Sequence, residues 1–331
     1  MNTTPTRARI LGTGHYVPQR RLTNQDLEQL VDTSDEWITT RTGISERRIA
    51  APEEATSDLA LHASRAALEA AGLSATDLDM MIVGTISPDM AFPSTACMLQ
   101  TKLGARAIPA FDLGAACSGF LYALDLAGHM VRAGTHRHIL VLGAEILSRI
   151  TDYEDRASCV LFGDGAGAVI VGPSEKADQG LLDTVSGADG QYADLLRLPG
   201  GGSLCPATAE SVAARQHYMK IQGRAVYKLA VTHIVEVVRE LLRRNDLAPE
   251  AVDLYIPHQM NTRIMEASAQ RLGITMDRVY VDIDRYGNTS AASIPIALDE
   301  AVRTGAIQPG MDVVMVAFGG GLTWAATWMR W

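Results

Sequence analysis

The chain has 331 residues, of which 47% are hydrophobic and 20% are charged, and its formal net charge is −9. This is the composition of an ordinary globular protein with a large core, and the acidic balance argues against nucleic-acid binding, which needs a basic surface. Met1 to Arg9 lacks the apolar segment of a signal peptide, and no apolar run is long enough to span a membrane. We therefore expect a cytoplasmic protein that binds neither nucleic acid nor membrane.

In the first half of the chain, strand-like and helix-like segments alternate. Apolar and β-branched runs predict strands at 7–14, 80–84, 108–113 and 139–143, with a further strand inside 158–171. Periodicity predicts helices at 23–31, 57–71, 94–103 and 118–133, and a capped helix that carries Trp37 and Arg41 on one face. The glycine-rich turn 162–169 lacks the strand–glycine–helix order of a dinucleotide site, so tight backbone packing is the simpler interpretation.

The second half begins with an irregular region and then resumes the alternation. Residues 173–214 are rich in glycine and small polar residues, which predicts loops with some strand. Helices are predicted at 222–244, from 262 to 272 and up to Arg303, and strands at 254–256, 278–283, 312–317 and 323–330.

The two halves repeat each other at one offset. Leu68–Thr85 and Leu242–Gln259 share their apolar positions and a Leu/Val-Asp pair, at an offset of 174 (242 − 68). At the same offset 123–125 matches 297–299, and 139–142 matches 313–316. Three matches at one offset predict a duplicated α/β unit, with halves at 1–180 and 181–331 packed pseudosymmetrically. Functional residues are then expected at strand ends facing the junction.

Three polar residues follow predicted strands in this arrangement: Cys117, His258 and Asn288. A cysteine at a helix start meets unpaired N–H groups, which favours the nucleophilic thiolate. A thiol, an imidazole and a carboxamide together suit acyl transfer from a thioester. Taken singly, the three residues are better explained as a buried small side chain, a satisfied core histidine and a turn former. The repeat favours the functional interpretation because it brings the strand ends together.

The other cysteines are Cys97, Cys159 and Cys205, and no two of the four form a CxxC pair. Their spacing fits neither a disulfide framework nor a zinc site. We therefore expect reduced thiols, no metal and no bound cofactor.

Seven stretches carry a resemblance to a known family: TSDEWITTRTGISERR, AFPSTAC, DLGAACSGFLYAL, LFGDGAGA, IPHQMN, YGNTSAASIP and FGGGLTW. Together they resemble β-ketoacyl-acyl carrier protein synthase III, a condensing enzyme of type II fatty-acid synthesis, along essentially the whole chain. The resemblance implies a thiolase-like α/β fold with two pseudosymmetric halves in αβαβα layers. It also implies a homodimer.

The activity implied is a decarboxylative Claisen condensation. Cys117 would take an acyl group, typically acetyl, from coenzyme A, which is a substrate here. His258 and Asn288 would stabilise the enolate formed when malonyl-acyl carrier protein loses carbon dioxide, with Phe318 beside the departing carboxylate. The N–H groups of Cys117 and Gly321 would form the oxyanion hole.

The resemblance also implies binding residues. Coenzyme A would have its adenine between Trp37 and Arg156, with its phosphates and pantetheine along Thr33, Arg41 and Asn261. Phe92 would reach into the acyl pocket of a dimer partner. Two positions depart from the family pattern: Met260 stands where alanine is common, and Arg224 where some members carry asparagine.

The chain is acidic, and so are acyl carrier proteins, so the two would repel each other unless the chain has a local basic patch. Arg224 and Lys228 are four residues apart on one predicted helix, and Arg263 and Arg271 are eight apart on another. These four residues are candidates for carrier docking, and solvated surface charges are the alternative interpretation.

Three functions remain open from the sequence. The first is the fatty-acid condensing enzyme, and the second is a secondary-metabolic relative that transfers its acyl group to a different acceptor. The third is a non-catalytic scaffold, against which the intact Cys-His-Asn set argues.

Overall fold

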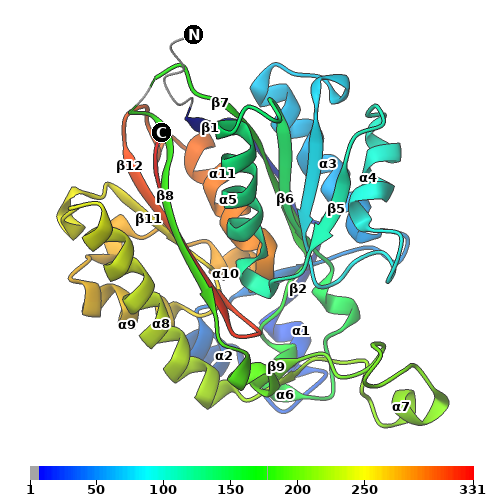
Figure 1. The fold of residues 1–331 in the computed structure, drawn as a ribbon. Helices are drawn as coiled ribbons and strands as arrows, with labels where there is room; N and C mark the ends of the chain where they lie inside the picture. The colour runs from blue at the N-terminus through cyan, green and yellow to red at the C-terminus, as the bar shows by residue number, and fades with distance from the viewer. Residues whose placement is uncertain (1–6, 177) are drawn as a thin grey trace.

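The computed structural model describes residues 7–176 and 178–331. Residues 1–6, at the start of the predicted N-terminal half, lie outside the described residues. Two large sheets face each other, with helices between them and on both outer faces (Figure 1). None of the helices in the described residues is both long and apolar enough to cross a bilayer.

The first sheet has the order β1-β7-β6-β4-β5, and the second has the order β11-β12-β13-β8. The first is built from β1 (Ala8–Tyr16), β4 (Met80–Gly84), β5 (Ala110–Leu113), β6 (Ile139–Glu145) and β7 (Gly165–Pro173). The second is built from β8 (Gly180–Ala188), β11 (Leu254–Pro257), β12 (Asp312–Gly319) and β13 (Thr323–Arg330). Two short pairs join β2 (Arg20–Thr23) to β3 (Glu46–Ile49) and β9 (Leu196–Arg197) to β10 (Lys220–Ile221).

Helices form three layers around these sheets. α3 (Thr56–Ala71) and α4 (Thr95–Leu103) cover one outer face, while α8 (Gly223–Arg244) and α9 (Thr262–Leu272) cover the other. α5 (Gly119–Arg132) and α11 (Ser293–Arg303) lie between the sheets (Figure 1). Alternate strand residues serve different layers: Ile82 packs in the central core, and Met81 and Val83 pack under α3 and α4. The layers confirm the thiolase-like αβαβα prediction.

The repeat is visible in the topology. In the first sheet β1, β7 and β6 pair antiparallel, and β6, β4 and β5 pair parallel. In the second sheet β8, β13 and β12 pair antiparallel, and β12 and β11 pair parallel. The two connecting turns also match: three-residue 3₁₀ turns at Ala116–Ser118 and Ser290–Ala292 precede α5 and α11 at the 174-residue offset.

The predicted strand at 278–283 is wrong. Val279 makes one isolated parallel bridge to Tyr255, and the chain turns into α10 (Ile283–Tyr286). The buried Gln259 side chain replaces a strand partner there, because its amide donates to the Tyr280 carbonyl at 3.0 Å and its oxygen accepts from the Asp282 N–H at 3.1 Å. With those backbone groups satisfied locally, no fifth strand forms.

The remaining helices are short or lie near the site: α1 (Asn24–Glu28), α2 (Asp35–Thr42), α6 (Arg156–Cys159) and α7 (Ala209–Ala213). The glycine-rich turn 162–169 is a close-packing device. A Cβ on Gly163 would lie 2.2 Å from the Tyr286 carbonyl oxygen, and one on Gly167 would lie 2.6 Å from the Ile296 nitrogen.

Candidate active site

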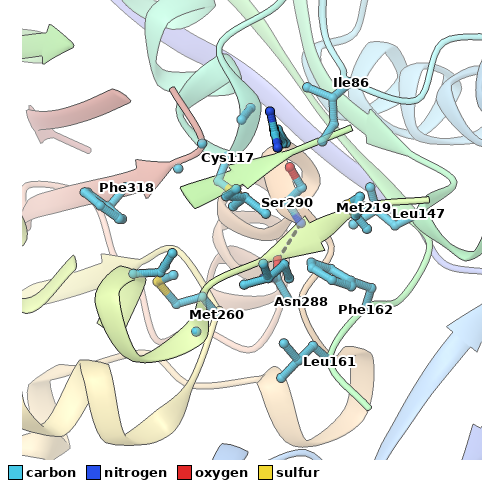
Figure 2. A pocket seen from close by; sticks show the side chains of 18 of the residues that line it. Ile86, Cys117, Leu147, Leu161, Phe162, Met219, Met260, Asn288, Ser290 and Phe318 are labelled. Atoms are coloured by element: carbon cyan, nitrogen blue, oxygen red, sulfur yellow. Dashed lines mark hydrogen bonds between the residues drawn. The ribbon is translucent and has the colours of Figure 1, made fainter. Parts of the chain in front are cut away.

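Cys117 lies in the 3₁₀ turn between β5 and α5 and borders a cavity of about 300 Å³. Asn288, Ser290 and Phe318 border the same cavity, as Figure 2 shows. Most of the remaining wall is apolar, including Ile86, Leu147, Leu161, Phe162, Met219 and Met260. An apolar chamber with a few convergent polar groups is typical of a small-molecule site.

The thiol of Cys117 does not have the acidity that the sequence predicted. Burial raises the pKa of Cys117 to about 12, and the nearby Glu145 carboxylate adds to the rise. The helix start was expected to favour the thiolate, but removal of water from a sulfur that is only 6% exposed outweighs that effect. In this state Cys117 is a neutral thiol, so its reaction needs a group that accepts the proton.

His258 directly follows β11, as predicted, and is buried. Its Nδ1 lies 2.6 Å from the Ser293 hydroxyl oxygen. That oxygen also accepts the Gln259 N–H at 3.4 Å. A Ser293 hydroxyl that donates to Nδ1 would place the ring proton on Nε2. Burial lowers the pKa of His258 to about 3. His258 is therefore a neutral imidazole, and its Nε2 atom has no hydrogen-bond partner among the described residues.

Asn288 follows α10 and Gly287 rather than a strand, which corrects the predicted placement. The residue is anchored by its backbone, because its N–H donates to the Leu161 carbonyl at 2.9 Å and its carbonyl accepts from Gly163 at 3.1 Å. The side-chain Oδ1 accepts the Ser290 N–H at 2.9 Å (Figure 2). The Nδ2 protons of this cavity-lining amide are thus left to donate to a ligand.

The loop after β12 closes the site on the other side of the sulfur. A Cβ on Gly319 would lie 2.6 Å from the Cys117 nitrogen, so the two backbones touch. The Thr323 hydroxyl ties this loop to the Cys117 turn by donating to the Ala115 carbonyl at 2.9 Å. Gly319 and Gly320 border the cavity with fully buried Phe318. Gly321, the predicted second oxyanion donor, belongs to the same loop.

A chain of contacts links the cavity to the predicted coenzyme A residues. Asn261 borders the cavity and caps α9, and its Nδ2 donates to the Arg41 carbonyl at 3.0 Å. The Arg41 guanidinium lies 5.9 Å from the Trp37 ring centre, and that of Arg156 lies 4.4 Å from it. Arg156 therefore already covers the indole, and an adenine can enter between them only if this side chain moves.

Thr33, the remaining predicted coenzyme A residue, precedes α2. Its hydroxyl oxygen is buried and has no hydrogen-bond partner among the described residues. A buried hydroxyl in this state is available to a ligand.

The structure separates the four predicted docking cations. The exposed residues Arg224, Lys228 and Arg263 stand at the starts of α8 and α9, which meet where the Tyr227 hydroxyl donates to the Arg263 carbonyl at 3.4 Å. Tyr227 and Gly223 also border the cavity. Arg271 lies at the other end of α9, where Arg239 donates to its carbonyl at 2.7 Å. Arg224, Lys228 and Arg263 are thus next in sequence to residues that line the cavity, and Arg271 is not.

Phe92 does not border the cavity of its own chain and is 85% exposed. The sequence analysis missed two polar residues beside Cys117, Glu145 and Ser290. A carboxylate inside the apolar run 139–147 was the signal for Glu145, and the repeat, which matches Ser290 to Ala116, was the signal for Ser290. Among the described residues, no cluster of histidine, cysteine and acidic side chains could hold a metal.

The layered fold, with a cysteine on a turn at the junction of two similar halves, defines the thiolase-fold class of condensing enzymes. Family models described as 3-oxoacyl-[acyl-carrier-protein] synthase III and its C-terminal part match residues 111–190 and 242–331. The chain is 54% identical over 324 residues to a β-ketoacyl-[acyl-carrier-protein] synthase III of Caldanaerobacter subterraneus subsp. tengcongensis, covering 98% of each chain.

Two solved structures extend the comparison. The 3-oxoacyl-[acyl-carrier-protein] synthase III of Aquifex aeolicus VF5 matches with a TM-score of 0.91 at 48% identity, over 98% of this chain and 100% of that one. The priming β-ketosynthase of the R1128 polyketide biosynthetic pathway matches with a TM-score of 0.90 at 36% identity, over 99% and 97%.

The chain therefore belongs to the 3-oxoacyl-[acyl-carrier-protein] synthase III family. It is an acyltransferase of the type that starts fatty-acid synthesis by condensing an acyl-coenzyme A with malonyl-acyl carrier protein.

Proposed function

We propose that the condensation runs through an acyl-Cys117 intermediate, with acetyl-coenzyme A as the usual donor. The observation that carries this proposal is the shared cavity of Cys117 and Asn288, together with a buried His258 whose Nε2 has no hydrogen-bond partner among the described residues. The sulfur attacks the donor thioester, and the N–H groups of Cys117 and Gly321 receive the carbonyl oxygen as its charge develops. Coenzyme A leaves, and the acyl chain stays in the apolar chamber.

In the second half-reaction, malonyl-acyl carrier protein loses carbon dioxide and its thioester becomes an enolate. His258 Nε2–H and Asn288 Nδ2–H both donate to the enolate oxygen. A neutral imidazole suits this task because it donates without needing protonation at working pH. Phe318 packs beside the malonyl carboxylate, where an apolar surface favours loss of the charge. The enolate carbon then attacks acyl-Cys117, and one proton from solvent balances the reaction.

Intact-mass measurement tests the intermediate directly. The protein is exposed to a panel of acyl-coenzyme A donors and then to malonyl-acyl carrier protein. We expect the acyl mass on native protein, its absence in Cys117→Ala, and its loss on adding the second substrate. In His258→Ala and Asn288→Ala the acyl mass should form and persist. Condensation without any acyl-enzyme in a rapid-quench series would refute the covalent route.

Substrate delivery is proposed to use two neighbouring surfaces. Coenzyme A follows the contacts from Asn261 to Trp37, and Arg156 moves to admit the adenine. The carrier protein docks on Arg224, Lys228 and Arg263 at the cavity mouth, where opposite charge favours encounter. Arg271 lies in the last turn of α9, so the docking surface we propose leaves it out.

Charge reversal separates the two surfaces. The double variant Lys228→Glu/Arg263→Glu should raise KM for malonyl-acyl carrier protein about tenfold and leave acyl transfer from coenzyme A intact. The exposed Arg239→Glu change at the far end of α8 is the matched control. Arg271→Glu tests how far the docking surface extends along α9. If it raised KM as much as the double variant does, the carrier protein would dock elsewhere than at the cavity mouth.

A homodimer is also proposed. β5 has no partner strand on its outer side among the described residues, its four residues are all half-exposed, and Phe92 nearby in sequence is 85% exposed. An uncovered edge strand and an exposed aromatic side chain fit a surface that a second copy covers. Sedimentation analysis tests the dimer, and a shift in acyl-chain preference in Phe92→Ala tests its reach into the partner's pocket.

A cytoplasmic location is proposed as well. The reaction needs Cys117 as a reduced thiol, and the cytoplasm keeps thiols reduced.

A secondary-metabolic role is the second candidate, and the similarity to the R1128 priming β-ketosynthase favours it. In that role acyl-Cys117 forms as before, but a different carrier or acceptor consumes it. Competition between malonyl groups on a fatty-acid carrier protein and on a polyketide carrier protein distinguishes the two. A higher kcat/KM with the polyketide carrier would replace the fatty-acid assignment.

A further inference from the structure

Glu145 is a buried carboxylate with no part in the reaction described above. It ends β6, is fully buried, and belongs to a strand whose other residues are apolar or glycine. Four donors hold one side of it: the Thr85 hydroxyl, the Ile86 N–H, and the N–H and hydroxyl of Ser87. All four reach Oε2, whereas Oε1 receives only the Ile86 N–H at 3.3 Å. Oε1 therefore retains the capacity to accept another proton donor.

The turn that carries Ser290 packs against β6, the strand that Glu145 ends: a Cβ on Gly143 of β6 would lie 2.0 Å from the Ala291 carbonyl oxygen. The Ser290 side chain borders the cavity beside Cys117 (Figure 2). The hydroxyl interacts with both neighbours: it opposes the rise that burial causes in the pKa of Cys117 and in that of Glu145. Its oxygen is buried and has no hydrogen-bond partner among the described residues, which leaves the hydroxyl available to either neighbour.

We propose that Glu145 takes the Cys117 proton through the Ser290 hydroxyl when Cys117 is acylated. The S–H bond breaks as Ser290 Oγ accepts that proton, and the Ser290 O–H proton passes to Glu145 Oε1. The sulfur electron pair forms the new bond to the acyl carbon, and the bond to the coenzyme A sulfur breaks. Glu145 then returns the proton through Ser290 to the leaving coenzyme A sulfur, which restores the carboxylate, so acylation neither consumes nor releases a proton overall.

Charge explains why a buried pair suits this step. An ionised Glu145 opposes ionisation of Cys117. Once the proton has moved to Glu145, the carboxylate no longer repels a negative charge on the sulfur. Cys117 and Glu145 together still carry one negative charge, which is now on the sulfur. Burial also raises the pKa of Glu145 to about 7, so the carboxylate can accept a proton near neutral pH. His258 is a weaker candidate because its Nδ1 is hydrogen-bonded to Ser293, and the enolate role proposed above needs the ring proton on Nε2.

Ser290 can be compared with the equivalent residue of the first half, Ala116, which stands 174 residues earlier. Ser290 has a φ of 49° and Ala116 a φ of 46°. The two turns share this unusual backbone, but only the second places a hydroxyl at the position. Because glycine adopts such a φ without strain, Ser290→Gly removes the hydroxyl and preserves the turn.

The test is single-turnover acylation of Cys117, followed by intact mass across pH 5.5–9.5. It rests on the proposed acyl-Cys117 intermediate. Native protein should show a rate that rises to a plateau with an inflection near neutral pH. Glu145→Gln and Ser290→Gly should each lose about 10²-fold at pH 7, and their rates should climb through pH 9 as hydroxide replaces the lost base. Ser118→Ala, which removes the buried hydroxyl next to Cys117 in sequence, is the matched control and should retain the native profile.

The outcomes are distinguishable. Failure of native Cys117 to acylate would remove the proposed intermediate itself. Native profiles in both variants would overturn the relay and leave the intermediate standing. A slow Glu145→Gln with a native Ser290→Gly would refute the hydroxyl as carrier. If Glu145→Gln does not fold, the Ser290→Gly profile decides, because the glycine keeps the turn.

Discussion

The two halves share one backbone plan but carry different chemistry at equivalent positions. In the first half, Gly84 at the end of β4 lies against Gly119 at the start of α5, so closely that a Cβ on Gly84 would meet the Gly119 carbonyl carbon at 2.8 Å. At the 174-residue offset the second half has His258 and Ser293, joined by a 2.6 Å hydrogen bond. The same strand end and helix start thus meet through their backbones in the first half. In the second half they meet through a hydrogen bond that orients the His258 imidazole.

The nucleophile shows the reverse distribution. Cys117 corresponds to Ala291, whose carbonyl oxygen lies against Gly143 of β6. The first half therefore carries the sulfur, and the second half carries His258 and Asn288, the groups proposed to stabilise the enolate. Duplication therefore placed two similar strand-to-helix turns at one junction. Residues of each turn can be substituted separately to test which of them the reaction needs.

The largest effect is expected from moving the thiol between the equivalent positions. Cys117→Ala should lower the condensation rate by about 10³-fold or more, because the covalent intermediate cannot form. Adding Ala291→Cys should not restore it, because position 291 is 1% exposed and does not border the cavity. Steady-state condensation and intact mass measure both. Acylation of the relocated cysteine would show that the turn of the second half is equally competent.

The two close glycines should respond differently to an added methyl group. Gly319→Ala puts a Cβ 2.6 Å from the Cys117 nitrogen, which should displace the sulfur and slow acylation about 10²-fold. Gly143→Ala puts one 2.0 Å from the Ala291 carbonyl oxygen, in the turn of the second half, and should mainly cost stability, about 1–3 kcal/mol. Acylation kinetics and thermal unfolding of both variants separate the effects. If Gly319→Ala and Gly143→Ala were both stable and lost acylation activity equally, the expected difference between the two positions would be refuted.

Ser293 should matter to one half-reaction only. Without its hydroxyl the ring proton of His258 can move to Nδ1, leaving Nε2 unable to donate. Ser293→Ala should therefore slow malonyl decarboxylation about tenfold and leave Cys117 acylation unchanged, while Ser293→Thr, which keeps the hydroxyl, should restore the rate. Release of labelled carbon dioxide measures the first step and intact mass the second. Nitrogen NMR of His258 reports the tautomer, and an Nε2–H signal retained in Ser293→Ala would refute this positioning role.

Much of this arrangement could be predicted from local pattern. The repeat predicted the paired topology, and His258 and the Cys117 turn lie at strand ends as expected. The strand at 278–283 could not be excluded, because the Gln259 side chain that replaces its partner acts from a distant position in the chain. The thiolate prediction failed for a related reason. A helix start is visible in the sequence, whereas burial of the sulfur and the nearness of Glu145 depend on how the two halves pack.

The buried titratable groups of the two halves should shift stability with pH in opposite directions. Burial lowers the pKa of His258 to about 3, so below its unfolded pKa near 6.5 the unfolded chain binds a proton that the folded chain excludes. That term destabilises the fold as pH falls. Burial raises the pKa of Glu145 to about 7, so between 4.5 and 7 the folded chain binds the extra proton. That term stabilises the fold as pH falls.

Between pH 4.5 and 6.5 the two terms oppose each other. Glu145→Gln removes the stabilising one, so its unfolding free energy should fall with acid more steeply than that of the native protein, by about 1 kcal/mol per pH unit. His258→Gln should change the slope in the opposite direction. Urea unfolding at several pH values measures both slopes. Parallel curves for native protein and Glu145→Gln would mean that Glu145 is ionised throughout this range, and would also remove the carboxylate as a group poised to exchange a proton near neutral pH.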